Sequence, residues 1–255
     1  MTEQLDHPEF KSFMDFVRAT GTKIIVLPLE KGLRGLALTK GWIQDMQKGR
    51  GGALSEIAQS LSKVMGTPSP QFLMPLLNSI SDTGKPMIFV DPTSIAREQI
   101  TVPGEYGNEM LRFLGTIQHE LGHTAFGYPG EPKQFAITQQ ILAEVPESKR
   151  GEISKFSDLV GVSLRNKPGE VLAEGFSQYT GTTKSREWLQ QNFPGVYDLV
   201  EAWMRRHPNP EIQKMIDAPP MFDFSPEMAE ALTPGSIAAR RAETGPTSME
   251  MAQKF

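Results

Sequence analysis

The sequence predicts an α+β fold in which a small twisted sheet packs on one long helix and the C-terminal half is mainly helical. Two short apolar runs, residues 23–27 and 85–91, have the length of buried strands. A helix with an apolar stripe follows the second run, from residue 108 to about residue 125. The segments beyond it repeat apolar residues at helical rather than alternating spacing, which favours a helical second half.

Helices are also predicted around the first strand and before the second. Asp6 and Glu9 form a helix-start pattern, and apolar residues follow it at helical spacing up to Val17. Three more helices are expected around residues 42–46, at 54–61 and from residue 69 onward. The last of them is expected to be interrupted near Pro75, because proline has no N–H group to donate within a helix.

After the long helix, the same spacing predicts helices near residues 134–145, 150–161, 168–180 and 195–206. From His207 onward the residue composition changes, and prolines separate short polar stretches. We therefore expect one domain over residues 1–221 and a loosely attached, proline-rich tail over residues 222–255. The alternative is an ordered arm, anchored on the domain by Phe222, Phe224 and Met228.

Composition disfavours several functional classes. The net charge of −4 offers no basic surface to a phosphate backbone, so we expect no nucleic-acid partner. The chain contains no cysteine, so any metal site must use histidine and carboxylate ligands. No apolar core follows a basic start, and no stretch approaches the roughly 20 apolar residues of a membrane span. We expect a soluble protein with no membrane partner, either cytoplasmic or exported without a signal peptide.

One pentapeptide, His119-Glu120-Leu121-Gly122-His123, matches the pattern H-E-x-x-H on the predicted long helix. Residues four apart lie one turn apart on the same helix face, so two imidazoles can bind one ion there. The glutamate between them lies to the side, where it can take a proton from a zinc-activated water. The chain has only 4 histidines, so a chance match is rare. The alternative is a surface helix with two incidental histidines.

A catalytic zinc normally has three protein ligands and one open position. The extended pattern H-E-x-x-H-x-x-G-x-x-H fails here, because Pro129 stands where the third histidine would be. No aspartate follows the motif closely, which leaves a glutamate on the predicted helix at 168–180. Glu170 and Glu174 are four apart and share one face of that helix, opposite an apolar stripe, so either could reach the zinc. The alternative is that this face is simply a solvated surface.

The segments HELGH and GEVLAEGFSQY together resemble the gluzincin metallopeptidases. Their residue pattern is most similar to that of the catalytic-domain group of anthrax lethal factor, whose later helix reads E-F-F-A-E-A-F. The resemblance covers about residues 105–180, under a third of the chain, and implies a zincin-like fold and a zinc peptidase. In that group the first glutamate of E-x-x-x-E binds zinc and the second supports a ligand, which implies Glu170 as the ligand and Glu174 behind it. The helix also resembles the L-N-E-G-F-x-x-Y helix of gluzincin aminopeptidases, which would place the ligand at Glu174.

The sequence departs from the lethal-factor group at the residue that stabilises the oxyanion. That group has a tyrosine shortly before the ligand helix, and Ser163 occupies about that position here. The candidate donors are Tyr106, Tyr128, Tyr179, Tyr197 and His207, among which Tyr179, Tyr128 and His207 are preferred. Packing or surface positions are the alternative for each of them.

Together these features predict a zinc-dependent endopeptidase, with Zn²⁺ bound by His119, His123 and Glu170 and with Glu120 as general base. Its partner would be a protein or peptide substrate extended along an edge strand, for which Met87–Val90 is the candidate. The alternative is that this strand is central and buried. A toxin or effector protease is one role for such an enzyme. The other functional readings are a zinc aminopeptidase and a catalytically silent, peptidase-like binding module, although the intact Glu120 argues against the second.

Overall fold

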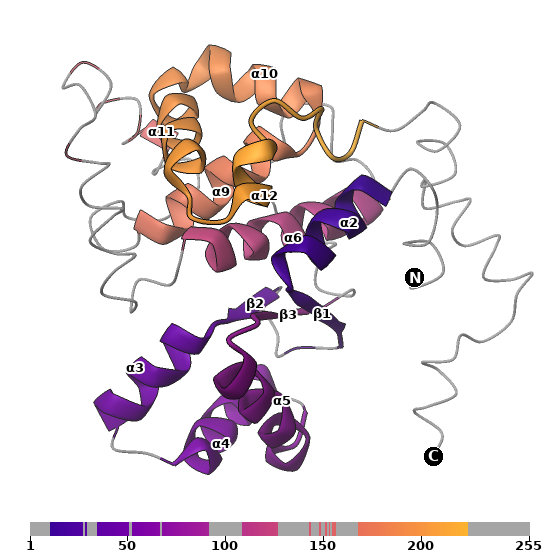
Figure 1. Ribbon diagram of the computed structural model, residues 1–255, viewed down its shortest axis with the longest axis vertical. Helices are drawn as coiled ribbons and strands as arrows, with labels where there is room; N and C mark the ends of the chain where they lie inside the picture. The colour runs from indigo at the N-terminus through magenta and orange to yellow at the C-terminus, as the bar shows by residue number, and fades with distance from the viewer. Residues whose placement is uncertain are drawn as a thin grey trace, which may run out of the picture.

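A computed structural model of the chain describes residues 11–27, 29, 35–50, 53–66, 68–91, 109–126 and 168–223, with six single positions between 143 and 156. Over these residues the fold is α+β, with a small mixed sheet among helices (Figure 1). The α+β class predicted from the sequence is therefore confirmed. None of the helices described is both long and apolar enough to cross a membrane.

The sheet has three short strands in the order β1-β3-β2. β1 (Lys23–Val26) runs parallel to β3 (Met87–Val90), and β2 (Gly35–Leu38) runs antiparallel to it. β3 is buried along its whole length because it lies between the other two strands. The expectation that Met87–Val90 is an edge strand open to a substrate is therefore wrong, since β3 pairs with a neighbour on each side.

β2 was not predicted from the sequence. Its four residues, Gly-Leu-Ala-Leu, include no β-branched or aromatic side chain, which are the types that mark strands. The segment forms a strand because β3 supplies its hydrogen-bonding partner and because Ala37 and Leu38 are fully buried. In the described part of the chain, β2 and β1 are the two edges of the sheet.

One face of the sheet packs on α6 (Glu109–Phe126), which carries the H-E-x-x-H motif. Ile88 and Val90 of β3 point to this face and are fully buried. They share a hydrophobic cluster with buried residues of α6, namely Leu114, Ile117 and Leu121. The predicted packing of the sheet on the motif helix is thus present, and it holds the motif helix against β2 and β3.

The other face of the sheet is covered by helices from the N-terminal half, which lie opposite α6 in Figure 1. Met87 and Phe89 alternate with their neighbours and point to this face. They pack in a second cluster with α3 (Lys40–Arg50), α4 (Leu54–Met65) and α5 (Pro70–Thr83). Helices therefore cover both faces of the sheet, with the motif helix on only one of them.

The predicted interruption at Pro75 is wrong, because α5 runs through this residue without a break. Pro75 is close to the N-terminus of the helix, where it removes a single backbone hydrogen bond. The helix beyond it is anchored by Leu77 and Ile80, which are fully buried in the second cluster. Tertiary packing thus outweighs the local effect of the proline.

A helical layer covers the side of α6 that faces away from the sheet (Figure 1). α9 (Pro168–Thr180) packs along α6, and α10 (Thr183–Asn192) and α11 (Pro194–Arg206) pack on α9. The short α12 (Pro210–Lys214) connects this layer to α2 (Lys11–Thr20). α9 and α11 lie where the sequence predicted helices, whereas α10 was not predicted.

The chain remains part of the core as far as Phe222. The backbone N–H groups of Met221 and Phe222 donate to the carbonyls of Thr180 and Gly181, both at 2.9 Å. The Phe222 ring is 2% exposed and lies 5.2 Å from the ring of Phe13. Phe222 therefore anchors this end of the described chain, as the ordered-arm alternative expected for that residue.

Several sequence predictions fall on residues outside the described ones. They include the helix-start pattern of Asp6 and Glu9, the helices at 134–145 and 150–161, apart from single positions, and the tail beyond residue 223 with Phe224 and Met228. Among the single positions, Ile153 and Phe156 are buried in the same cluster as α6. The division of the chain into a domain and a loose tail stays a prediction.

Candidate metal centre

The candidate site forms where α6 and α9 cross closely. A Cβ atom added to Gly122 would lie 2.7 Å from the Cα of Ala173, so only glycine permits this approach. Gly122 stands between the two motif histidines in the sequence, and Ala173 stands between Glu170 and Glu174. The contact of the two small residues therefore brings the histidine pair of one helix to the glutamate pair of the other.

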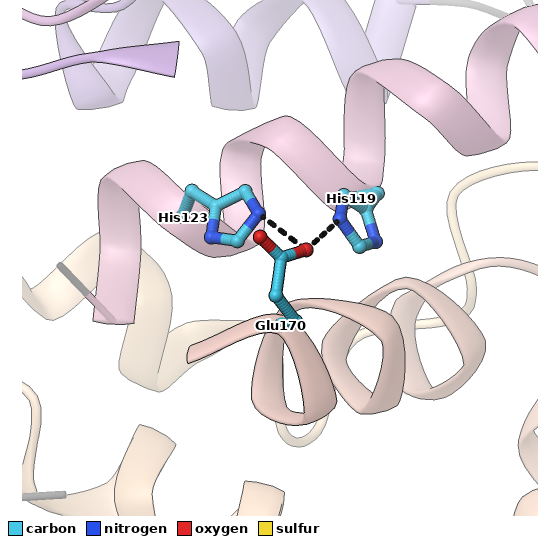
Figure 2. A group of neighbouring side chains, drawn as sticks. All are labelled: His119, His123 and Glu170. Atoms are coloured by element: carbon cyan, nitrogen blue, oxygen red, sulfur yellow. Dashed lines mark hydrogen bonds and ion pairs between the residues drawn. The ribbon is translucent and has the colours of Figure 1, made fainter. Parts of the chain in front are cut away.

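His119, His123 and Glu170 point toward one another across this crossing (Figure 2). The Oε2 atom of Glu170 lies 3.3 Å from Nε2 of His119 and 3.3 Å from Nε2 of His123. A tetrahedral zinc ion with bonds of about 2.0–2.1 Å separates its donor atoms by about 3.3–3.4 Å. Both distances to Glu170 already have this value, and all three donors lie within 4.8 Å of one another. The group could therefore hold a metal ion, and two histidines with one glutamate are a known zinc ligand set.

Glu174 contacts the other nitrogen of His119. Its Oε2 atom lies 3.0 Å from Nδ1 of His119, and its Oε1 atom accepts a 2.9 Å hydrogen bond from the Gln178 side chain. A carboxylate that accepts a hydrogen bond from Nδ1 leaves Nε2 as the nitrogen that can bind a metal ion, which is how ligand histidines are commonly oriented. The structure thus brings Glu170 to both Nε2 atoms and Glu174 to the back of one imidazole.

Electrostatics couples these groups strongly. Burial alone would lower the pKa of His119, but the hydrogen bonds with Glu170 and Glu174 outweigh it and raise the pKa to about 10. Burial would raise the pKa of Glu170, yet hydrogen bonds from His119 and His123 hold it far below its usual range. Without a metal ion, these contacts favour a protonated His119 between the two carboxylates. A metal ion needs the lone pair on Nε2, so the metal and a proton compete for that atom.

Glu120 lies beside this group and is only 6% exposed. Its carboxylate accepts a hydrogen bond from the backbone of Ala37 on β2. Its Oε2 atom is buried and has no hydrogen-bond partner within the described part of the protein. Burial raises the pKa of Glu120, and the neighbouring His123 and His119 oppose the shift. A buried carboxylate oxygen without a protein partner, next to a metal-ligand set, suits a group that accepts a proton from water.

The candidate oxyanion donors that the structure describes, Tyr179, Tyr197 and His207, pack elsewhere than at the site. The Tyr179 ring is buried 4.9 Å from the Tyr197 ring and stacks under the guanidinium of Arg186, on the side of α9 that packs on α10 and α11. Burial raises the pKa of the Tyr179 hydroxyl above its usual range. These contacts give both tyrosines a packing role. Tyr106 and Tyr128 lie outside the described residues.

His207 uses both of its ring nitrogens at the end of the motif helix. Nε2 donates to the carbonyl of Ala125 at 3.1 Å, and Nδ1 accepts from the backbone N–H of Asn209 at 3.0 Å. The ring also packs on Trp203 with a centroid distance of 4.5 Å. His207 therefore caps the C-terminal end of α6, which leaves no nitrogen for an oxyanion.

Three parts of the site were not singled out in the sequence. Gln178 continues the four-residue spacing of Glu170 and Glu174, so the pattern contained a signal for it. Ala37 belongs to a distant strand and has no functional side chain, so nothing in the sequence pointed to it. The same is true of the contact between Gly122 and Ala173.

Replacing Gly122 with alanine is expected to push α6 and α9 apart, because the new methyl group would overlap Ala173. Overpacking of a close contact typically costs about 1–3 kcal/mol of stability. The variant should melt at a lower temperature and bind zinc more weakly, as measured by calorimetry and by competition with a chelator. Gly151→Ala is the control, since a Cβ at Gly151 meets no atom within 4 Å. Equal stability and zinc affinity in Gly122→Ala and wild type would contradict this account of the crossing.

Comparisons of the chain with protein-family models, with curated proteins and with solved structures found no match.

Proposed function

We propose that the protein is a zinc-dependent endopeptidase with a zincin-like site. The observation that carries the proposal is the donor group itself: two imidazoles and one carboxylate within 4.8 Å of one another, with the carboxylate 3.3 Å from each imidazole and Glu120 beside them. A purely structural zinc site normally has four protein ligands and needs no base. Three donors with an adjacent carboxylate are instead typical of hydrolytic zinc sites.

In this proposal His119, His123 and Glu170 hold the zinc ion, and Glu174 orients His119. The bound ion would supply a Lewis acid that polarises the scissile carbonyl and lowers the pKa of the attacking water. Glu120 accepts the proton of that water and then delivers it to the leaving amine. Burial suits Glu120 to both steps, because a raised pKa brings a carboxylate closer to neutral pH.

The substrate strand is assigned to β2 instead of β3, because β2 is an edge of the sheet and its Ala37 contacts Glu120. An extended peptide would pair with the outer side of β2 through main-chain groups other than the Ala37 N–H, which Glu120 uses. This arrangement would place the scissile bond beside Glu120.

The proposal is tested by metal analysis of the purified protein, followed by cleavage of a peptide library. We expect one zinc per chain and cleavage products from wild type that Glu120→Gln does not form. A protein without zinc, or one whose cleavage is independent of Glu120, would overturn it.

A pair of substitutions separates the two glutamates of α9. Glu170→Ala should weaken zinc binding more than Glu174→Ala, because Glu170 faces both Nε2 atoms and Glu174 contacts only Nδ1 of His119. Loss of a group behind a metal ligand typically costs about 10–100-fold in affinity, and loss of a ligand costs more. Zinc affinities are measured by competition with a chelator. A larger loss in Glu174→Ala would favour the aminopeptidase-like alignment instead.

A further inference from the structure

Gly35 occupies a position where the backbone does not require glycine. Positive φ angles occur at Gly21, Gly66 and Gly84 among the described glycines, but Gly35 lies in the regular strand β2. Glycine within a strand weakens it, because it has no side chain to pack and loses more backbone freedom on folding. The reason for a glycine at this position must therefore lie in the space around it.

That space is filled by Glu120. A Cβ atom at Gly35 would lie 2.5 Å from Oε1, 2.6 Å from Cγ and 2.8 Å from Cδ of Glu120. Because the overlap includes Cγ as well as the carboxylate, a small shift of the oxygens would not relieve it. The whole Glu120 side chain would have to adopt another rotamer. It is 6% exposed, so few alternative positions are open to it.

Ala37, two residues further along β2, holds the same carboxylate. Alternate residues of an antiparallel strand direct both N–H and C=O toward the partner strand, and the residues between them direct these groups away. Because the backbone of Ala37 hydrogen-bonds Glu120, Ala37 belongs to the outward-facing set. Leu36 and Leu38 then bond to β3, opposite Phe89 and Met87. Glu120 thus fills the space that a side chain at Gly35 would occupy, and its carboxylate accepts from the outward-facing N–H of Ala37.

We propose that Gly35 is a positioning residue for Glu120. Because Gly35 has no side chain, it leaves the space in which the Glu120 carboxylate reaches the Ala37 N–H beside the zinc ligands. The role of Glu120 as a base rests on the proposed function, whereas its placement by Gly35 does not. The buried, unpartnered Oε2 of Glu120 supports the inference, because a carboxylate held on one oxygen presents the other one to a ligand.

The test measures amide hydrogen exchange by NMR in Gly35→Ala, Glu120→Ala and the double variant. Each single variant should speed exchange at Ala37 by about 10–100-fold, the effect of losing one charge-assisted hydrogen bond. The double variant should exchange no faster than Glu120→Ala, because both changes remove the same bond. Exchange at Leu36 and Leu38 should stay slow in all variants, since these amides bond to β3.

Gly151→Ala is the control for a glycine with open space around it, and it should change none of the three amides. Unchanged exchange at Ala37 in Gly35→Ala would overturn the proposal. Equal acceleration at Leu36, Ala37 and Leu38 would also overturn it, because Gly35 would then support the strand instead of Glu120. If Gly35→Ala does not fold, the double variant must fold, since it lacks the overlapping side chain; if it too fails to fold, the proposal is wrong.

These results are distinguishable from a failure of the proposed function. Zinc content and peptide cleavage test the peptidase, and exchange at Ala37 tests the placement of Glu120 whether or not a substrate is known. Should wild type cleave peptides, Gly35→Ala is expected to keep its zinc and KM and to lose kcat toward the level of Glu120→Ala. A loss of zinc in Gly35→Ala would instead show that Gly35 acts on the ligands.

Discussion

Replacing His123 with alanine is expected to abolish stoichiometric zinc binding, and His119→Ala should have the same effect. Each substitution removes one of three donor atoms and leaves two, in a site where no cysteine is available as a substitute. Loss of a ligand should exceed the roughly 10–100-fold reduction in affinity that is typical for groups behind the ligands. His123 is only 3% exposed, so a solvent-facing side chain cannot easily take its place.

The zinc content of dialysed protein is measured by inductively coupled plasma mass spectrometry, and folding is checked by circular dichroism. His207→Ala is the control variant, because both ring nitrogens of His207 contact backbone groups and neither contacts the three candidate metal ligands. We expect one zinc per chain in wild type and in His207→Ala. Retention of one zinc in both His119→Ala and His123→Ala would show that the metal binds elsewhere.

Glu120→Gln is expected to keep zinc and the fold but to lose hydrolysis by about 10²–10⁴-fold, the usual contribution of a general base. An amide has the shape of a carboxylate, and its oxygen can still accept the hydrogen bond from Ala37. It cannot accept a proton at neutral pH, so the chemical step should suffer while metal binding does not.

The measurement is kcat and KM on a peptide found in the library, with zinc content determined on the same samples. A lower kcat at unchanged zinc content would support the assigned role of Glu120. A variant that cleaves the peptide as fast as wild type would rule out Glu120 as the base. Loss of zinc in Glu120→Gln would mean that Glu120 contributes to binding the metal.

Much of the candidate metal centre could be predicted because its parts are local. The spacing of four residues puts His119 and His123 on one face of α6, and it puts Glu170 and Glu174 on one face of α9. The two glutamates could not be separated by spacing alone, and only the resemblance gave Glu170 as the ligand. The crossing at Gly122 and Ala173 separates them in space, because it places Glu170 opposite both Nε2 atoms and Glu174 opposite Nδ1.

The predictions that were wrong share one cause: contacts between segments far apart in the sequence, which local sequence patterns do not report, determined the structure. The apolar run at Met87–Val90 is typical of a buried strand, but its sequence does not say how many strands flank it. Pro75 was expected to interrupt a helix by a local rule, and burial of the residues after it prevailed. For Tyr179, named as one of several candidate donors, the sequence left a packing position open as the alternative, and the ring lies on the face of α9 that packs on other helices.

By itself, the sequence determined the α+β class, the motif helix, the glutamate helix and the residues that can bind a metal. These depend on helix periodicity and on donor chemistry, which act over a few residues. Only the tertiary structure decided that Gly35–Leu38 forms an edge strand among the described residues, that Glu120 reaches it, and that three donors meet within 4.8 Å of one another. The physical reason is that each of these contacts is between segments that lie many residues apart in the sequence. They are set by how closely backbones pack where side chains are small, at Gly35 and Gly122.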